Sequence, residues 1–284
     1  MQSVVGNFGS LILLTLPIGN PEDISLRGLE VLKNKDLFVS EDTRTFKRLL
    51  DHFGIDSSQK RIISFHDHSH EKRYKEIVEI LKAHKDVYFV SEAGSPIVSD
   101  PAYPLVKYCL ENHIQIDSIG GISSVISALE LSGLRSQPFQ FIGFLPRKDA
   151  QIKEILKNLY QFKGTSIVFE SPRRLEDTLR ILIETKLDFR VSIIKEISKT
   201  FQNCYRYDHP EEIDFSEIDF RGEFVLVLEA KNQGINSLDN EHLQTLAHNV
   251  LKNQGKKKAL AKLLGEILSV DSKEIYKELV GDKI

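Results

Sequence analysis

The fold is decided by the stretch Leu11-Ile12-Leu13-Leu14-Thr15-Leu16, an apolar run of strand length that ends before Pro17. A segment with the spacing of an amphipathic helix follows at residues 25–34. Strand-like and helix-like segments alternate again at residues 37–40 and 46–53, 61–64 and 71–84, and 87–91 and 104–112, before a last strand at 116–119. Parallel strands need crossover helices, so this rhythm predicts an open, mostly parallel sheet with helices on both faces.

A second series of segments follows the glycine pair Gly120-Gly121. We expect strands at residues 139–143, 165–170, 191–196, 204–207 and 224–228, and helices at residues 150–162 and 175–184. Several of these strands are joined by short stretches without helical spacing. The second sheet is therefore predicted to be mixed.

A polar, glycine-containing segment at residues 231–237 is the best candidate for a linker. Beyond it we expect three short helices at residues 241–253, 256–268 and 273–280, the last opened by Asp271 with Glu274 three residues later. The predicted fold class is α/β. Two α/β lobes at residues 1–121 and 122–230 are followed by a small C-terminal three-helix module at residues 237–284.

Composition places the chain in the ordinary globular class. Of its 284 residues, 41% are hydrophobic and 28% are charged, which excludes a disordered or fibrous protein. The formal net charge of −3 provides no global attraction for polyanions, so contact with a nucleic acid needs a local basic patch. Cys109 and Cys204 form no CxxC motif, and no apolar run approaches the roughly 18 residues that span a bilayer. We expect a soluble, cytoplasmic protein without membrane contact.

Two loops at the carboxyl ends of predicted strands have the residue types of a ligand site, and open α/β sheets bind ligands at this end. In residues 15–21, two prolines fix the backbone and Gly19 allows close approach, although a rigid turn explains this loop equally well. The loop at residues 91–101 exceeds the roughly 2–6 residues of most such connections. It contains Gly94 and two prolines and adds nothing to a core, so we predict a ligand-binding role for it.

Three further segments carry polar groups after predicted strands. Residues 119–124 open a helix at Ser123, for which an ordinary N-cap is the favoured explanation. Residues 169–174 end a buried strand with a carboxylate and two guanidinium groups, and a solvated helix start competes with a functional role there. Glu41 and Asp42 also end a strand; such a charged run is usually a solvated face, but the pair can act as a base.

A histidine cluster at His66, His68 and His70 suggests a zinc site. No cysteine accompanies these residues and no HExxH helix is present. We therefore expect no metal.

The motifs at these loops resemble those of the ribosomal RNA small subunit methyltransferase I family, which is of the tetrapyrrole-methylase type. In order along the chain they occupy residues 15–20, 41–44, 64–66, 92–101, 144–148, 170–175 and 222–227, with a tail at 255–276 that resembles the family's helical module. Three details depart from the usual pattern: Glu92-Ala93-Gly94-Ser95-Pro96 replaces Asp-Ala-Gly-Thr-Pro, Ala102 replaces a glycine, and Gly120-Gly121-Ile122-Ser123-Ser124 stands where the family has Gly-Pro-Ser-Ala. The carboxylate and hydroxyl groups are retained.

This resemblance implies the activity, the cofactor and the partner. The expected reaction is S-adenosylmethionine-dependent 2′-O-methylation of a cytidine ribose in the decoding region of 16S ribosomal RNA. The family places the cofactor in the cleft between two α/β lobes and works as a homodimer. A sulfonium is already an activated methyl donor, so no metal is needed.

The loops and the resemblance together nominate the site residues. As the base that removes the hydroxyl proton we expect Glu41 or Asp42 first and Glu170 second. The expected cofactor-binding residues are Pro17, Glu92, Ala93, Gly94, Ser95, Ile97, Ser123, Ser124 and Phe169. The expected RNA-binding residues are Arg44, Lys47, Arg48, Arg147, Arg173 and Arg174, extended by the lysine cluster at residues 252–262.

Two other functions stay open on sequence alone. A precorrin-type tetrapyrrole methyltransferase would share the lobes but would have no use for the basic C-terminal module. A non-catalytic ribosome-binding protein would keep a degenerate cleft, for which the altered loops at Glu92 and Gly121 are the motivation. Binding of S-adenosylmethionine separates this last reading from an enzyme.

Overall fold

The computed structural model describes residues 8–65, 71–99, 102–231, 256–268 and 271–281. The chain divides into two compact units, residues 1–229 and 230–284. Most of the predicted linker and the first predicted C-terminal helix, at residues 241–253, lie outside the described residues.

The first sheet contains five parallel strands. They are β1 (Leu11–Leu14), β2 (Leu37–Ser40), β3 (Arg61–Ser64), β4 (Val87–Val90) and β5 (Ile116–Ile119), in the order β3-β2-β4-β1-β5. Strand β1 pairs on one side with β4, with Leu11 opposite Val87, and on the other side with β5, with Leu11 opposite Ile116. The predicted parallel sheet is thus confirmed, with the decisive stretch in its interior.

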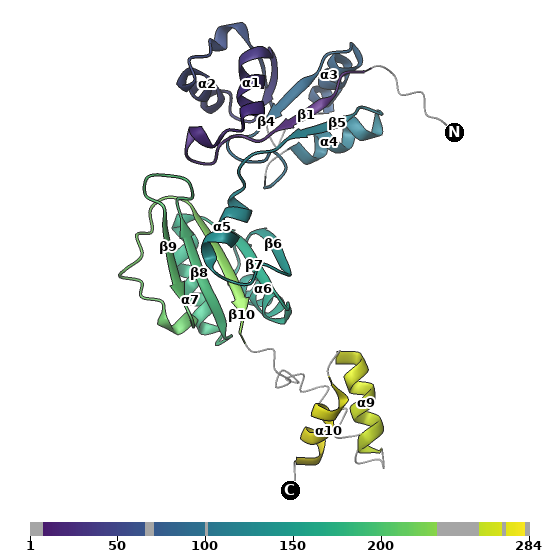
Figure 1. Ribbon diagram of the computed structural model, residues 1–284, viewed down its shortest axis with the longest axis vertical. Coiled ribbons are helices and arrows are strands. Elements are labelled where there is room, and N and C mark those ends of the chain that lie inside the picture. The colour runs from purple at the N-terminus through teal and green to yellow at the C-terminus, as the bar shows by residue number, and fades with distance from the viewer. Residues whose placement is uncertain (1–7, 66–70, 100–101, 232–255, 269–270, 282–284) are drawn as a thin grey trace, which may run out of the picture. The chain divides into compact units, whose positions relative to one another are not determined.

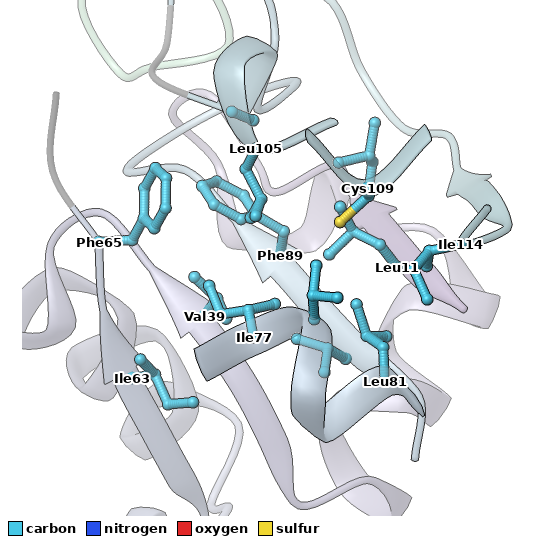
Figure 2. Packing of buried hydrophobic residues seen from close by; sticks show 14 residues of the cluster. Leu11, Val39, Ile63, Phe65, Ile77, Leu81, Phe89, Leu105, Cys109 and Ile114 are labelled. Atoms are coloured by element: carbon cyan, nitrogen blue, oxygen red, sulfur yellow. The ribbon is translucent and has the colours of Figure 1, made fainter. Parts of the chain in front are cut away.

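Helices cover both faces of this sheet (Figure 1). On one face, Leu11 and Leu13 pack with buried residues of α3 (Glu71–Lys82) and α4 (Ala102–Glu111), and Figure 2 shows this cluster around Phe89. On the other face, Ile12 and Leu14 pack with α1 (Leu26–Asn34) and α2 (Thr43–His52). Because neighbouring side chains of a strand point to opposite faces, the continuous apolar run of β1 supplies both cores.

The second sheet is mixed, as predicted. It contains β6 (Phe139–Phe144), β7 (Thr165–Glu170), β8 (Phe189–Lys195), β9 (Asn203–Tyr207) and β10 (Phe224–Ala230), in the order β6-β7-β10-β8-β9. Strands β6 and β7 run parallel, whereas β10 pairs antiparallel with β7 and β9 pairs antiparallel with β8. Helix α5 (Ser124–Ser132) packs on one face, and α6 (Asp149–Gln161) and α7 (Pro172–Glu184) lie on the other (Figure 1).

Two helices, α2 and α7, begin a full three residues earlier than the hydrophobic spacing predicts. Helix α2 starts at Thr43, three residues before the predicted start, because the Asp42 side chain accepts hydrogen bonds from the backbone N–H groups of Arg44 and Thr45. Helix α7 starts at Pro172, also three residues early, because proline fits the first helical position. A prediction based on apolar spacing does not detect a first helical turn that is made of polar residues.

In the C-terminal unit, α9 (Lys257–Leu268) and α10 (Ser272–Gly281) contact each other. Leu260, Leu264 and Ile275 are buried there. Asp271 opens α10 as predicted, since its Oδ1 accepts a hydrogen bond from the N–H of Lys273 at 2.9 Å. Across the described part of the chain, no helix combines the length and the apolar character needed to cross a membrane.

Candidate active-site cleft

A cavity of about 840 Å³ lies where loops of both sheets meet. This volume is within the range of small-molecule sites, roughly 300–1,000 Å³. The first sheet contributes the loops after β1 and β4 and one face of α2, and the second contributes the end of β7, the start of β10 and the turn after β8. The carboxyl ends of parallel strands therefore face the cavity, as expected for an open α/β sheet.

The loops after β1 and β4 are joined at the cavity wall. The Leu16 N–H donates to the Gly94 carbonyl at 3.0 Å, and the Gly94 N–H donates to the Leu16 carbonyl at 3.1 Å. Gly94 has φ +69°, and a Cβ atom there would lie 3.2 Å from Cγ2 of Ile18. The long loop is thus a rigid wall whose backbone lies close to the cavity, because its glycine has no side chain.

Helix α2 presents one face to the cavity. Thr45, Arg48, Leu49 and His52 line it, at the spacing of one helix face. Asp42 is used as the cap of this helix. Hydrogen bonds from the backbone of Arg44 and Thr45 hold the pKa of Asp42 below its ordinary value, which keeps it ionised but makes it a weaker base.

The carboxylate of Glu170 is buried and fully engaged. It accepts hydrogen bonds from the hydroxyl of Thr178 at 2.8 Å and from the N–H of Ser171 at 2.7 Å, and lies 3.4 Å from the guanidinium of Arg174. Arg174 also donates to the carbonyls of Leu145 and Pro146. This network ties the loop after β6 to the start of α7, at the edge of the cavity.

Two helices begin at the cavity with serines that make no capping bond. Ser123 precedes α5 and Ser171 precedes α7, and neither side chain caps its helix. Both line the cavity, together with Ser124. The N-cap explanation for Ser123 thus accounts for its position but not for its hydroxyl group. A helix N-terminus also favours negative charge, so both starts suit a polar or anionic ligand group.

The turn after β8 carries Lys199 and Glu196, and the residue before β10 adds a second carboxylate, Glu223. Nζ of Lys199 lies 2.8 Å from Oε2 of Glu223 and 3.0 Å from Oε1 of Glu196, and Lys199 and Glu223 line the cavity. Burial acts to raise the pKa of Glu196, but the hydrogen bond from the Glu223 backbone and the nearby Lys199 outweigh it, so this pKa is lowered. Burial acts to lower the pKa of Lys199, but its two carboxylate partners outweigh that effect and raise it. The lysine therefore stays protonated.

The same turn contacts the loop after β1. The hydroxyl of Ser198 accepts a hydrogen bond from the Asn20 N–H at 3.0 Å and donates one to Oδ2 of Asp23. A Cβ atom on Gly19 would lie only 2.5 Å from the Lys199 side chain. These contacts link the two sheets at the cavity wall and require glycine at position 19.

Comparison with known proteins decides the family. Residues 10–211 match the model of the Tetrapyrrole (Corrin/Porphyrin) Methylases. Three relatives, each named ribosomal RNA small subunit methyltransferase I, align over most of both chains. The relative from Halalkalibacterium halodurans is 37% identical, and the alignment covers 80% of this chain and 78% of the relative. The relative from Thermotoga maritima is 40% identical over 78% of this chain and 99% of the relative. The relative from Escherichia coli O157:H7 is 34% identical over 97% of this chain and 96% of the relative. The chain belongs to the ribosomal RNA small subunit methyltransferase I group of the tetrapyrrole methylase family.

Solved structures show the same fold at low identity. A diphthine synthase superposes with a TM-score of 0.60 at 18% identity, covering 81% of this chain and 94% of that one. A uroporphyrin-III C-methyl transferase from Thermus thermophilus, complexed with S-adenyl homocysteine, gives 0.52 at 15% identity, covering 78% and 97%. The predicted tetrapyrrole-methylase fold is confirmed.

In this tetrapyrrole methylase, most of the predicted cofactor residues gather at the cavity. Those that line it are Pro17, Glu92, Ala93, Gly94, Ser95, Ser123, Ser124 and Phe169, together with the base candidate Glu170 and the cation Arg48. Other predicted residues in the described part of the chain lie outside this lining: Ile97, Glu41, Asp42, Arg44, Lys47, Arg147, Arg173 and Arg174. The roles of all these residues stay predictions.

Two of the three departures from the family pattern, Ala102 and Gly121, have a structural explanation. Ala102 is the first residue of α4 and is fully buried, so its methyl group adds to core packing away from the cavity. A Cβ atom at Gly121 would lie 3.1 Å from Cγ2 of Thr15, so glycine suits that position.

Sequence reasoning missed the lining residues Thr45, His52, Lys199 and Glu223. The first two follow from placing α2 beside the cavity, which needs the tertiary structure. Lys199 could have been found, because its turn directly follows a predicted strand. The predicted histidine cluster lies outside the described residues, and within the described ranges no three His, Cys, Asp or Glu side chains are grouped to hold a metal ion.

Proposed function

We propose that this protein transfers a methyl group from S-adenosylmethionine to the 2′-oxygen of a cytidine ribose in the decoding region of 16S ribosomal RNA. The observation that carries the proposal is the cavity, formed by loops of both lobes in a chain whose relatives are named ribosomal RNA small subunit methyltransferase I. A cytoplasmic location, where ribosomal subunits are assembled, is part of the same proposal.

The residues of the cavity fit a cofactor that combines a nucleoside with an amino acid. Pro17, Phe169 and Val225 offer an apolar wall for a base, and the serines at positions 95 and 123 offer hydroxyl groups. Gly94 leaves its backbone open to close approach. When bound, S-adenosylmethionine supplies an activated methyl group on a sulfonium. The remaining demand on the protein is to position the ribose oxygen and remove its proton.

The cations around the cavity support the RNA side of the proposal. Arg48 lines the cavity, and Arg44 and Lys47 are exposed on the same helix. Arg147 and Arg173 are exposed on the second lobe. We assign phosphate contacts to these five residues. We assign Arg174 to holding the loop after β6, because its guanidinium already donates to two carbonyls.

A direct test is methylation of isolated small ribosomal subunits. Subunits from a strain that lacks this protein are incubated with the purified protein and labelled S-adenosylmethionine, and ribose methylation is mapped by mass spectrometry of RNA fragments. The proposal expects one labelled cytidine in the decoding region. If the protein binds the cofactor but labels no nucleotide, the proposed substrate is wrong. If calorimetry detects no binding of S-adenosylmethionine, a non-catalytic ribosome-binding protein is favoured.

We also propose that the protein is a homodimer. Tyr103 and Leu110 are seven residues apart on one side of α4, and their exposed fractions are 63% and 57%. We assign the association surface to this side of α4, because large exposed apolar side chains gain free energy when a partner covers them. Light scattering should give twice the chain mass, and Tyr103→Glu should shift it toward the monomer. A monomer in the unmodified protein would contradict this part of the proposal.

A further inference from the structure

Lys199 brings a fixed ammonium group to the cavity wall. Its side chain is 27% exposed, so one side faces the cavity while the other is held by Glu196 and Glu223. The two carboxylates differ. Glu196 is only 16% exposed and also accepts a hydrogen bond from the Glu223 N–H at 2.8 Å, whereas Glu223 is 77% exposed and lines the cavity. One carboxylate is therefore an internal anchor and the other is open to a ligand.

The backbone around Lys199 adopts an uncommon conformation. Glu196 has φ +51° and Ser198 has φ +66°, a region that few residues other than glycine occupy. Gly222 has φ +99°, and a Cβ atom there would lie 2.7 Å from the Glu196 carboxylate. Such backbone strain persists only where the surroundings enforce it, and it concentrates at functional sites.

Contacts with the first lobe enforce this conformation. The hydroxyl group of Ser198 forms hydrogen bonds with Asn20 and Asp23, and Gly19 leaves room for the Lys199 side chain. An ordinary surface ion pair needs neither the uncommon backbone conformation nor these contacts with the first lobe. Lys153 and Glu184, for example, pair at 3.0 Å between two regular helices. The difference indicates that the position of the Lys199 ammonium group matters for the cavity.

We infer that Lys199 and Glu223 are catalytic residues of the methyl transfer, and that Glu196 is a positioning residue that acts through Lys199. This inference rests on the proposed function. Lys199 donates a hydrogen bond to the ribose 2′-oxygen and stabilises the negative charge that develops there. Glu223 accepts the hydroxyl proton. The ribose oxygen forms its bond to the methyl carbon as the carbon–sulfur bond breaks, and the electron pair of that bond stays on sulfur.

The two carboxylates explain how the lysine keeps its charge during this step. When Glu223 takes the proton it becomes neutral and no longer balances the ammonium group. Glu196 remains ionised, because the backbone hydrogen bond and Lys199 lower its pKa. The lysine thus retains a counterion throughout and does not itself act as the base, since its pKa is raised.

The test compares Lys199→Met, Lys199→Arg and Glu223→Gln with Lys153→Met, a matched loss of an ion-paired lysine on the same lobe. Methyl transfer to the small ribosomal subunit yields kcat and KM, calorimetry yields the Kd of S-adenosylmethionine, and thermal unfolding yields Tm. We expect kcat to fall by about 100-fold or more in Lys199→Met and Glu223→Gln. Cofactor Kd should stay unchanged. Lys199→Met should lower Tm, because the largely buried Glu196 loses its partner, whereas Lys199→Arg should keep Tm and recover part of kcat.

Three outcomes would overturn the inference. An unchanged kcat in Lys199→Met or in Glu223→Gln removes the substituted residue from the chemistry, and the paired mechanism fails with it. A weaker cofactor Kd with normal kcat at saturation makes Lys199 a cofactor-binding residue. A lower Tm with no recovery in Lys199→Arg makes the cluster structural. Failure of the unmodified protein to methylate the subunit is a separate result, because it rejects the proposed function before any variant is compared.

Discussion

At the scale of single residues, the cavity depends on positions where a side chain would intrude. Gly94 is one of them, with φ +69° and the Ile18 side chain 3.2 Å from the position of a Cβ atom. The residue was predicted from the sequence because a glycine in a long loop at a strand end marks close approach of a ligand. Its conformation and its neighbour come only from the fold.

We predict that Gly94→Val weakens binding of S-adenosylmethionine by tenfold or more. A branched side chain in this backbone region costs about 1–3 kcal/mol, enough to displace the loop, and about 1.4 kcal/mol corresponds to tenfold in Kd. Calorimetric titration measures the change. Gly54→Val is the matched control, because Gly54 has φ +66° with open space around it. Equal cofactor affinity in the folded Gly94→Val protein would refute the placement of the cofactor.

Arg44 is a second residue whose role can be isolated. Its side chain is 86% exposed, so its guanidinium group is available to RNA. Only one nitrogen, Nη2, lies near a carboxylate, at 3.4 Å from Oδ2 of Asp42. Arg44→Ala should weaken binding to the ribosomal subunit and lower the salt slope of log K by about one unit, because one phosphate contact is lost. Arg27→Ala, which breaks a similar exposed pair with Asp117 at 3.5 Å, should leave the slope unchanged. Loss of cofactor binding with an unaltered slope would move Arg44 to the cofactor side.

At the scale of elements, the starts of α2 and α7 connect stability with function. Each begins with a polar group, Asp42 before α2 and Ser171 before α7, and in each the carboxylate predicted as a base also has structural hydrogen bonds. Apolar spacing identified the helices but placed both starts three residues late, since capping and proline effects act in turns that contain no core residues. Substitutions can separate the structural role from the catalytic one.

For α2, we expect Asp42→Ala to lower Tm by roughly 2–4 °C through loss of the cap. Asp42→Ser keeps a side-chain acceptor and should retain most of the stability. The pKa of Asp42 is lowered in the folded protein, so its stabilising effect is present above the ordinary carboxyl pKa and is lost as the pH falls below it. The Tm difference from Asp42→Ala should accordingly shrink in acid. Abolished methyl transfer in a stable Asp42→Ser protein would instead identify Asp42 as the base.

For α7, the buried network around Glu170 should dominate. Glu170→Ala leaves the Arg174 guanidinium without its carboxylate and should lower the free energy of unfolding by about 3–5 kcal/mol in urea titration. Glu176→Ala is the control on the same helix. It breaks only an exposed pair with Arg180 at 2.6 Å, which is worth at most about 0.5 kcal/mol. Similar losses in the two variants would show that the Glu170 network does not stabilise the lobe.

At the scale of the whole molecule, the chain divides into a large unit of residues 1–229 and a small unit of residues 230–284. We predict that mild proteolysis cuts first within residues 231–237, because a polar, glycine-containing linker is readily cleaved. Mass spectrometry of the first fragments identifies the site. First cuts within residues 1–229 would show that the boundary of the C-terminal module is misplaced.

The sequence by itself determined the two sheets and the loops that carry the cofactor residues. A continuous apolar run such as β1 is buried only when both faces of its sheet are covered. The loops that follow such strands are rich in glycine and proline and contribute no side chains to a core, which indicates a ligand-binding role. Only the tertiary structure decided which side chains meet. It brings the Arg48 face of α2, the Gly94 loop and the strained turn at Lys199 to one cavity, although they are more than 150 residues apart at the extremes. Local patterns record spacing along the chain, whereas a site between two sheets depends on how separate elements pack.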